Sequence, residues 1–415
     1  MAYETALRDD ARRRIEAIGR ADILVGIPSY NNAQTIGHVV RMAAQGMVKY
    51  FPDLKPVLIN SDGGSPDGTR EVVLSTPVPE GVEVIATEYQ GLSGKGSAFR
   101  AIFEAMQLLG AKVGVVVDSD LRSITPEWIE RLAGPIVEGD YDYVTPHYIR
   151  HKYDGTITNN ICYPMTRMLY GVDVRQPIGG DFGFSAKLAE SYLAKDVWDT
   201  DVARFGVDIW MTTTAINEGA RICQARLGAK VHDVKDPALT LGPMFVQVVG
   251  TLFRLMGLYE GNWKGVRGSR PAPLYGDAVE AEPEPVAVTL SAMIDKLRRG
   301  LEEEGPLWGE ILAEENLAAV REIAARPEGE YAFPADLWAR VVFDFAVAYN
   351  KSGLQPDRVI RAMTPLYYGR TAGLVVESKD MDSATFEREV IQAQARTFEE
   401  LKPYLIERWE GLSRV

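Results

Sequence analysis

Two carboxylates one residue apart, Asp118 and Asp120, directly follow an apolar run in the stretch "VGVVVDSDLRS". The run predicts a buried strand over 113–120, and on a strand residues i and i+2 face the same side. The two like charges would repel each other there unless a cation lies beside them. Carboxylate oxygens suit Mg²⁺ or Mn²⁺, which also accept substrate phosphates as ligands. The pair therefore favours a cation site, although D-x-D by itself is a common pattern.

Three further segments carry side chains that can bind an anion, a sugar or a metal ion. "GLSGKGSAFR" puts Lys95 among glycines before a predicted helix, whose free N–H groups and dipole attract a phosphate. "NSDGGSPDGT" puts Asp62 at a strand end, where it can accept hydrogen bonds from a base or a sugar. Neither segment has the spacing of a phosphate loop or of a dinucleotide fingerprint. His232 in "AKVHD" can join carboxylates around Mg²⁺ or Mn²⁺, or be an ordinary surface or core residue.

The first half of the chain alternates apolar β-branched runs with segments of helical period. The predicted strands are Asp22–Tyr30, Pro56–Asp62, Val82–Glu88 and Val113–Asp120, and the predicted helices are Ala33–Tyr50, Asp67–Ser75 and Gly96–Leu109. This order predicts a doubly wound, mostly parallel sheet. In such sheets ligands bind beyond the carboxyl ends of the strands. The segments that carry the candidate binding residues all lie at those ends.

The remainder of the chain is mixed and then helical. A strand in "YDYVTPHY", helices near Ile157–Leu169 and Val207–Glu218, and a strand over Arg221–Leu227 are predicted. The stretch 261–288 is rich in Gly, Pro and acidic residues, which is typical of a linker.

The predicted organisation has three parts. They are an α/β catalytic domain over 1–262, a linker over 263–288 and an all-helical module over 289–415. The segment "ADLWARVVFDFAVAYN" in the module is apolar enough to form its core, to pack on the first domain or to mediate self-association into a homo-oligomer. These alternatives stay open.

Composition excludes several classes of protein. The chain has 415 residues with 46% hydrophobic and 25% charged residues, a formal net charge of -13 and only two cysteines, Cys162 and Cys223. The acidic balance without a basic cluster argues against nucleic-acid binding, and the cysteine count against a disulfide framework. The start of the chain lacks the apolar region of a signal peptide, and the apolar stretch 238–259 is too interrupted to span a membrane. We expect a cytoplasmic protein without membrane contact.

Seven motifs in order give the chain a resemblance to a known family. They are "IPSYNNAQTIGHVV", "SDGGSPDGT", "GLSGKGSAF", "VVDSDLRSITPEWI", "RQPIGGDFGF", "RFGVDIWMT" and "LGAKVHDVKDPALTLGPMFVQV". Together they resemble the retaining GT-A glycosyltransferases that make glucosylglycerate, mannosylglycerate and their 3-phosphoglycerate counterparts. The resemblance spans about 22–256. It implies a GT-A fold, a nucleoside-diphosphate hexose as donor (ADP-, GDP- or UDP-linked) and Mg²⁺ or Mn²⁺ as cofactor.

The resemblance also implies roles for individual residues. The nucleotide and donor-sugar site would comprise Pro28, Ser29, Asn31, Asp62, Lys95, Asp118, Gly179 and Gly180, with Lys95 reaching the diphosphate. Asp120 and His232 would bind the divalent cation, Asp120 being the first choice of ligand.

Three residues are implied in the reaction itself. The backbone carbonyl of Ile178 would lie near the anomeric carbon. Asp181 stands where the family usually has the glutamate of "GGE", which shortens its reach to the sugar hydroxyls. Asp208 matches a carboxylate near the donor sugar and the acceptor.

The acceptor site is implied less directly. Thr158 stands where glycerate-using relatives present a threonine, with Arg150 upstream as a partner for a carboxylate, whereas phosphoglycerate-using relatives carry a glycine-rich "GGRVT" that this sequence lacks. A cap at the start of a helix is the structural alternative for Thr158.

The predicted function is therefore retaining transfer of a hexose to D-glycerate, with glucose favoured and mannose as the alternative, which yields a compatible solute of the glucosylglycerate type. We expect front-face displacement, with no dedicated nucleophile. The alternatives are 3-phosphoglycerate as acceptor, a GT-A enzyme acting on a lipid phosphate or polysaccharide, and a non-catalytic nucleotide-binding scaffold. A sugar nucleotidyltransferase is disfavoured because its glycine-rich start is absent after "ILVGIPSY".

Overall fold

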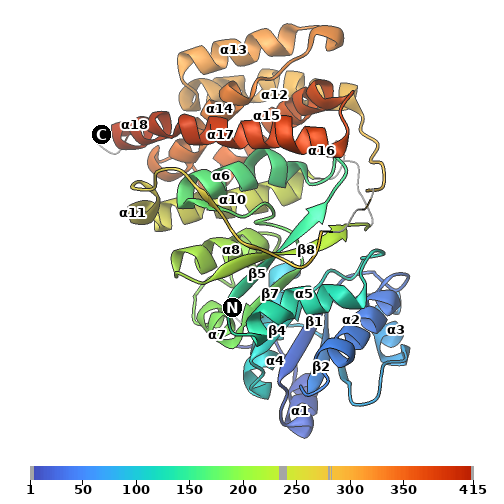
Figure 1. Cartoon of the computed structure of the whole chain (residues 1–415). Coiled ribbons are helices and arrows are strands. Elements are labelled where there is room, and N and C mark those ends of the chain that lie inside the picture. The colour runs from blue at the N-terminus through green and yellow to red at the C-terminus, as the bar shows by residue number, and fades with distance from the viewer. Residues whose placement is uncertain (1–3, 233–240, 279–280, 282, 413–415) are drawn as a thin grey trace. The chain divides into compact units, whose positions relative to one another are not determined.

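The computed structural model describes residues 4–232, 241–278, 281 and 283–412. The chain forms two compact units (Figure 1). Unit 1 comprises Met1–Ile149, Arg175–Asp233 and Ala272–Pro283, and unit 2 comprises Arg150–Val174, Val234–Pro271 and Glu284–Val415. This division by packing differs from the predicted boundaries at 262 and 288, because two segments of the first 271 residues pack with the later helices. Packing units do not show which residues carry an activity, so the catalytic domain over 1–262 stays a prediction.

Unit 1 is built on an eight-stranded sheet in the order β10-β8-β5-β7-β4-β1-β2-β3. The strands are β1 Ile23–Ser29, β2 Pro56–Asp62, β3 Glu83–Glu88, β4 Val113–Val116, β5 Tyr143–Ile149, β7 Phe182–Ser185, β8 Ile222–Ala229 and β10 Leu274–Tyr275. Only β7 runs antiparallel to its neighbours, β4 and β5. Every residue of β1, β2 and β4 is buried, as expected for strands covered on both faces. The predicted mostly parallel α/β sheet is confirmed.

Helices cover both faces of this sheet. They are α1 Asp9–Ile18, α2 Ile36–Tyr50, α3 Thr69–Ser75, α4 Lys95–Leu109, α5 Pro126–Val137, α7 Ala186–Leu193 and α8 Val207–Asn217, with a 3-10 turn at Asp201–Ala203 (η2). Ile23, Val25 and Ile27 of β1 belong to a core shared with α2 and α5, whereas Gly26 lies against Ile102 of α4. Because neighbouring strand residues face opposite sides, α4 covers the other face.

Unit 2 is almost entirely helical. Its helices are α6 Tyr163–Tyr170, α10 Gly242–Leu258, α11 Glu260–Trp263, α12 Leu290–Ile311, α13 Glu314–Ala325, α14 Ala335–Lys351, α15 Pro356–Ser378, α16 Ser383–Phe386, α17 Gln392–Glu400 and α18 Lys402–Leu412, with π-helical turns at Thr158–Cys162 (η1) and Glu387–Ile391 (η4) and a 3-10 turn at Glu328–Glu330 (η3). In the described part of 289–415 every regular element is helical, as predicted. Among the described helices, none has both the length and the apolar character needed to cross a bilayer.

The predicted linker over 263–288 is more ordered than its composition suggests. It contains two short strands: β9, Arg270–Pro271, pairs with β6, Val172–Asp173, and β10 pairs with β8. Local composition does not indicate these strands, because partners far away in the sequence supply their hydrogen bonds, and the linker over 263–288 stays a prediction.

Buried polar side chains join the helices of unit 2. Asp344 on α14 is buried, and its carboxylate accepts hydrogen bonds from Ala313 N (3.0 Å), Asn316 Nδ2 (2.8 Å), Tyr404 OH (2.7 Å) and Arg408 Nε (2.9 Å). One side chain thus ties α13, α14 and α18 together.

Lys402, at the start of α18, makes the stability of the chain pH-dependent. Its ammonium donates to Met168 O (2.9 Å) and Val266 O (3.0 Å), and burial, with the nearby Arg267 charge, lowers the pKa of Lys402 to about 8. The unfolded chain, with a lysine pKa near 10.4, binds more protons than the folded chain between these values, so stability from this group rises as the pH goes from about 8 to 10.4. Urea unfolding of the wild type and Lys402→Met should show the wild type gaining about 1–3 kcal/mol relative to the variant over this window. A pH-independent difference would contradict this expectation.

Candidate functional site

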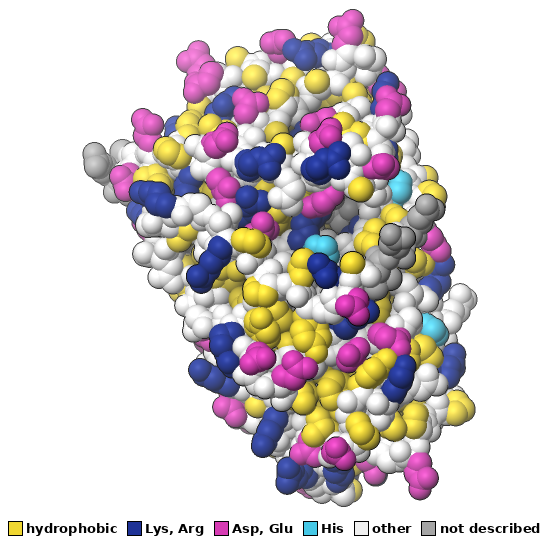
Figure 2. Space-filling view, in the orientation of Figure 1, with side chains coloured by type: hydrophobic (Ala, Val, Ile, Leu, Met, Phe, Trp, Pro, Cys, Tyr) yellow, Lys and Arg dark blue, Asp and Glu magenta, His cyan; other side chains and the backbone are white. Residues whose placement is uncertain are grey.

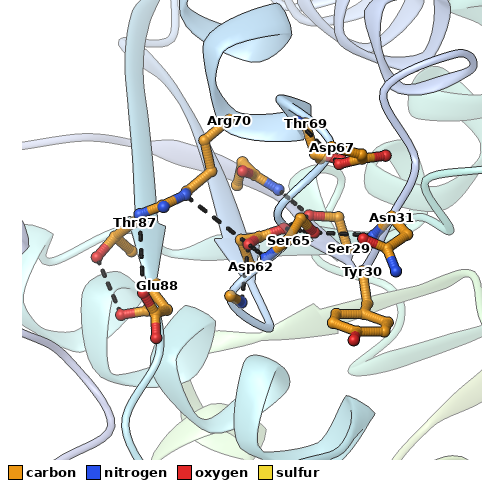
Figure 3. Close-up of polar contacts among 12 residues, drawn as sticks. Ser29, Tyr30, Asn31, Asp62, Ser65, Asp67, Thr69, Arg70, Thr87 and Glu88 are labelled. Carbon is orange, nitrogen blue, oxygen red and sulfur yellow. Dashed lines mark hydrogen bonds and ion pairs between the residues drawn. The ribbon is translucent and has the colours of Figure 1, made fainter.

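The carboxyl ends of β1 and β2 are joined by a buried hydrogen-bond network around Asp62 (Figure 3). Its Oδ1 accepts from Ser29 Oγ (2.6 Å) and Ser65 Oγ (2.7 Å), and its Oδ2 accepts from Gly64 N (2.9 Å) and Ser65 N (2.7 Å). Asn60 Nδ2 donates to Ser29 Oγ at 2.8 Å. Asp62 is wholly buried, and its carboxylate accepts hydrogen bonds from the turn that follows it. Its contact with a nucleotide stays a prediction.

The chain turns toward the surface at the end of β1. Pro28, within β1, lies opposite Ser61 of β2. Asn31 adopts a left-handed backbone, with φ of 59°, and its N–H donates to Ser65 Oγ at 2.8 Å. Tyr30, which directly precedes Asn31, is 62% exposed. The turn after β1 is thus fixed at Asn31 and presents an aromatic ring to solvent.

Asp118 and Asp120 do not lie on a strand. The predicted strand 113–120 is wrong beyond Val116, where β4 ends, and the two aspartates occupy the turn that follows. The expected positive charge is present beside Asp118 as two lysines: Lys95 Nζ lies 2.8 Å from Oδ1 and Lys230 Nζ lies 2.8 Å from Oδ2. Burial opposes ionisation of Asp118, but these ammonium groups outweigh it and hold its pKa far below the usual value.

The segment 178–181 approaches Asp118 through its backbone and a carboxylate. Asp181 Oδ1 accepts from Asp118 N at 2.8 Å, and Asp181 Oδ2 accepts from the Tyr148 hydroxyl. Gly180 has φ of +85°, and a Cβ atom built on it would lie 2.1 Å from Asp118 Oδ2. Ile178 is half-buried at the start of this segment. The close approach to Asp118 therefore requires glycine at 180.

Asp208, on the first turn of α8, completes this buried group of charges. Its Oδ1 lies 3.6 Å from Lys95 Nζ and makes no hydrogen bond within the described part of the chain. Burial raises the pKa of Asp208, and the Lys95 charge opposes that shift. A buried, incompletely paired carboxylate oxygen is a ready acceptor for a sugar hydroxyl.

Asp120 and His232 lie together as the metal prediction requires. His232 Nδ1 is 3.9 Å from Asp120 Oδ2, and burial together with the charge of Asp118 raises the pKa of Asp120. In the described residues no group of three or more His, Cys, Asp or Glu side chains could hold a metal ion. Two protein ligands fit Mg²⁺ or Mn²⁺ that takes its remaining ligands from diphosphate oxygens and water. Residues 233–240 of the seventh motif lie outside the described part of the chain.

The amino end of α4 differs from the expected phosphate site. Gly96 N donates to Arg204 O at 3.1 Å, so this amide is not available to a ligand. The turn η2 packs so closely here that a Cβ atom on Gly96 would lie 1.8 Å from Val202 O. The prediction of free amides is therefore wrong at Gly96, whereas Lys95, the first residue of the helix, is directed at carboxylates instead.

The two predicted acceptor residues belong to unit 2. Thr158 is buried in the π-helical turn η1, and Arg150 Nε lies 3.7 Å from Asp154 Oδ2. The helix already includes residues 156 and 157, so Thr158 lies within its first turn and not at its cap, and the capping explanation for Thr158 is wrong. Acceptor binding by these residues stays a prediction.

Sequence reasoning missed two members of the buried group, Lys230 and Tyr148. Lys230 stands two residues before His232 in the quoted motif "AKVHD", so its position was a signal that could have been used. Tyr148 stands near the end of β5 and has no such sequence signal.

The sheet and the charged groups at the carboxyl ends of its strands define an α/β protein with a cluster of ionised side chains at that edge of the sheet. Residues 24–193, which include most of these groups, match the family model described as Glycosyl transferase family 2. This part of the chain is similar to family 2 glycosyltransferases, which confirms the predicted resemblance.

Curated relatives carry a more particular name. The chain is 25% identical over 260 residues to the glucosyl-3-phosphoglycerate synthase of Mycolicibacterium paratuberculosis, covering 57% of this chain and 73% of the relative. It is 23% identical over 259 residues to that of Petrotoga mobilis, covering 57% and 74%.

Solved structures of similar proteins include the glucosyl-3-phosphoglycerate synthase from Mycobacterium tuberculosis in complex with Mn²⁺, uridine diphosphate and phosphoglyceric acid. Its TM-score with this chain is 0.46 at 23% identity, over 60% of this chain and 82% of the other. A second structure of that protein contains Mg²⁺ and uridine diphosphate, with a TM-score of 0.46 at 23% identity, over 61% and 85%.

Proposed function

We propose that this chain is a retaining, metal-dependent hexosyltransferase that moves glucose from a nucleoside-diphosphate sugar to 3-phosphoglycerate. The observation that carries the proposal is the group of Lys95, Asp118 and Asp208 beside the Asp120–His232 pair, in a chain whose residues 24–193 match Glycosyl transferase family 2. The names of the curated relatives favour 3-phosphoglycerate over free D-glycerate as acceptor.

In this proposal Asp120 and His232 hold Mg²⁺ or Mn²⁺. When bound, the ion neutralises charge on the departing diphosphate. Burial opposes protonation of Lys95, but the charges of Asp118 and Asp208 raise its pKa above the usual value, so the side chain stays cationic. A fixed ammonium group next to the diphosphate stabilises the negative charge that develops there.

The remaining residues orient the donor sugar. Asp208, through its Oδ1 atom, accepts a hydrogen bond from a sugar hydroxyl. The Ile178 carbonyl faces the anomeric carbon, and Pro28, Ser29 and Asn31 line the nucleotide site. In front-face displacement the diphosphate oxygen takes the proton of the acceptor, which requires no protein nucleophile.

Thr158 and Arg150 are proposed to bind the carboxylate of the acceptor. D-Glycerate is a second candidate acceptor, because the sequence carries "YDGTITNN" and lacks the glycine-rich "GGRVT" of phosphoglycerate-using relatives. A carboxylate is common to both acceptors, and a phosphate distinguishes them.

A substrate panel tests the proposal. UDP-, GDP- and ADP-linked glucose and mannose are incubated with 3-phosphoglycerate, D-glycerate or no acceptor, with Mg²⁺ or Mn²⁺, and released nucleoside diphosphate is measured. We expect the fastest release with a glucose donor and 3-phosphoglycerate, an α-linked product by NMR and loss of turnover with EDTA. Turnover with D-glycerate but not with 3-phosphoglycerate would favour the second candidate. Failure to form a glycosylated product with either acceptor, from any of the donors, would contradict the proposal.

A further inference from the structure

Lys230, the residue immediately after β8, is a buried lysine at the centre of the charged group. Its side chain is 2% exposed. Its ammonium nitrogen lies 2.8 Å from Asp118 Oδ2, 2.7 Å from Gly179 O and 3.1 Å from Asp181 Oδ2. The Tyr148 ring also lies beneath the ammonium, with 5.0 Å to the ring centroid. One cation thus connects three segments that are far apart in sequence.

The two lysines on Asp118 are not equivalent. Lys95 is 17% exposed, whereas Lys230 is almost completely enclosed. Lys95 therefore remains on the side from which a ligand can approach, and Lys230 acts from within the fold. Between them they occupy both carboxylate oxygens of Asp118, whereas Asp120 Oδ2 lies 3.9 Å from His232 Nδ1.

We propose that Lys230 is a positioning residue of the glycosyl-transfer site: an internal counter-ion that fixes the Asp118 carboxylate and the Gly179 carbonyl and leaves Asp120 as the carboxylate that takes the divalent cation. The inference rests on the proposed function for its effect on turnover. Its effect on metal binding follows from charge alone.

The charge argument predicts opposite effects on metal affinity and on turnover. Without Lys230, the charges of Asp118 and Asp181 are less compensated, so the site becomes more negative and a divalent cation binds more tightly. At the same time Asp118 and Gly179 lose the group that holds them, so the donor sugar is held less well. A merely structural lysine would weaken both properties on removal.

The experiment compares Lys230→Met and Lys230→Arg with the wild type. Mn²⁺ affinity is measured by electron paramagnetic resonance without nucleotide, and kcat and KM are measured with the best donor and acceptor. We expect Lys230→Met to bind Mn²⁺ about three- to tenfold more tightly and to lose about 30-fold or more in kcat. Lys230→Arg should restore the wild-type Mn²⁺ affinity and most of kcat, because it retains the charge and the donors.

Lys402→Met is the matched control, since it removes a buried lysine in unit 2 and should change neither Mn²⁺ affinity nor kcat. If Lys230→Met fails to fold, the double variant Lys230→Met/Asp181→Asn is compared with Asp181→Asn alone, because this pair differs only in the lysine, and the double variant should bind Mn²⁺ more tightly than Asp181→Asn. Unchanged or weaker Mn²⁺ binding in the folded variant, or kcat within threefold of the wild type, overturns the inference. Mn²⁺ binding by a wild type that transfers no sugar would contradict the proposed function only.

Discussion

Asp120→Ala is expected to lower kcat/KM for sugar transfer by about 10³-fold or more while the fold stays intact. Its side chain is 26% exposed near Asp118, and both partial burial and that like charge raise the pKa of Asp120. A group that is unfavourably placed in the metal-free protein contributes little to stability, so its removal should change the free energy of unfolding by less than about 1 kcal/mol. His232 alone would not retain the ion. Mn²⁺ binding, steady-state kinetics and thermal unfolding measure the three effects.

Asp53→Ala is the matched control for Asp120→Ala, because Asp53 is an exposed aspartate in the segment between α2 and β2. It should behave as the wild type in all three measurements. An Asp120→Ala enzyme that keeps more than a third of the wild-type turnover would eliminate the metal assignment.

Gly180→Ala is expected to lower kcat by about 10²-fold or more and to destabilise the fold by about 1–3 kcal/mol. Gly180 has φ of +85°, and the new Cβ atom would lie 2.1 Å from Asp118 Oδ2 and 2.6 Å from its Cγ. The carboxylate must then move, which breaks its contacts with Lys95 and Lys230. Kinetics and denaturant unfolding of the same preparation measure both effects.

Gly139→Ala separates the backbone strain from the clash. Gly139 has nearly the same backbone angle, φ of +82°, but no atom lies within 4 Å of its built Cβ. It should share part of the loss in stability and keep wild-type kinetics. Equal turnover of the two alanine variants would contradict a role for the Asp118 position in catalysis.

Regular elements of unit 1 could be predicted well because apolar periodicity reports burial directly. The strand Pro56–Asp62 was predicted with its observed bounds, and Gly96–Leu109 differs from α4 by one residue. The strand after Lys112 was predicted too long, since apolar residues do not show where strand pairing ends. Pairing with β1 stops near Gly26, and the chain then turns.

Contacts between distant segments could not be predicted from local pattern. The strands within 263–288 depend on β6 and β8, and the amide of Gly96 is taken by Arg204, about 100 residues away. Asp120 and His232 were paired through the family resemblance, and the structure brings them within 3.9 Å. Lys230 lies two residues before His232, but the sequence does not show that this lysine is buried against carboxylates.

Charge on the visible face of the molecule is mixed: Figure 2 shows Lys and Arg side chains interspersed with Asp and Glu rather than gathered into a basic patch. Self-association through the helical module stays a prediction.

The close packing of η2 against Gly96 limits how this site can be redesigned. The segment 201–206 lies against the first turn of α4 and leads directly into α8. The position of this segment therefore affects both Lys95 on α4 and Asp208 on α8. An insertion or deletion in that segment would displace both groups together. Libraries intended to broaden donor choice should therefore keep its length and vary residues elsewhere.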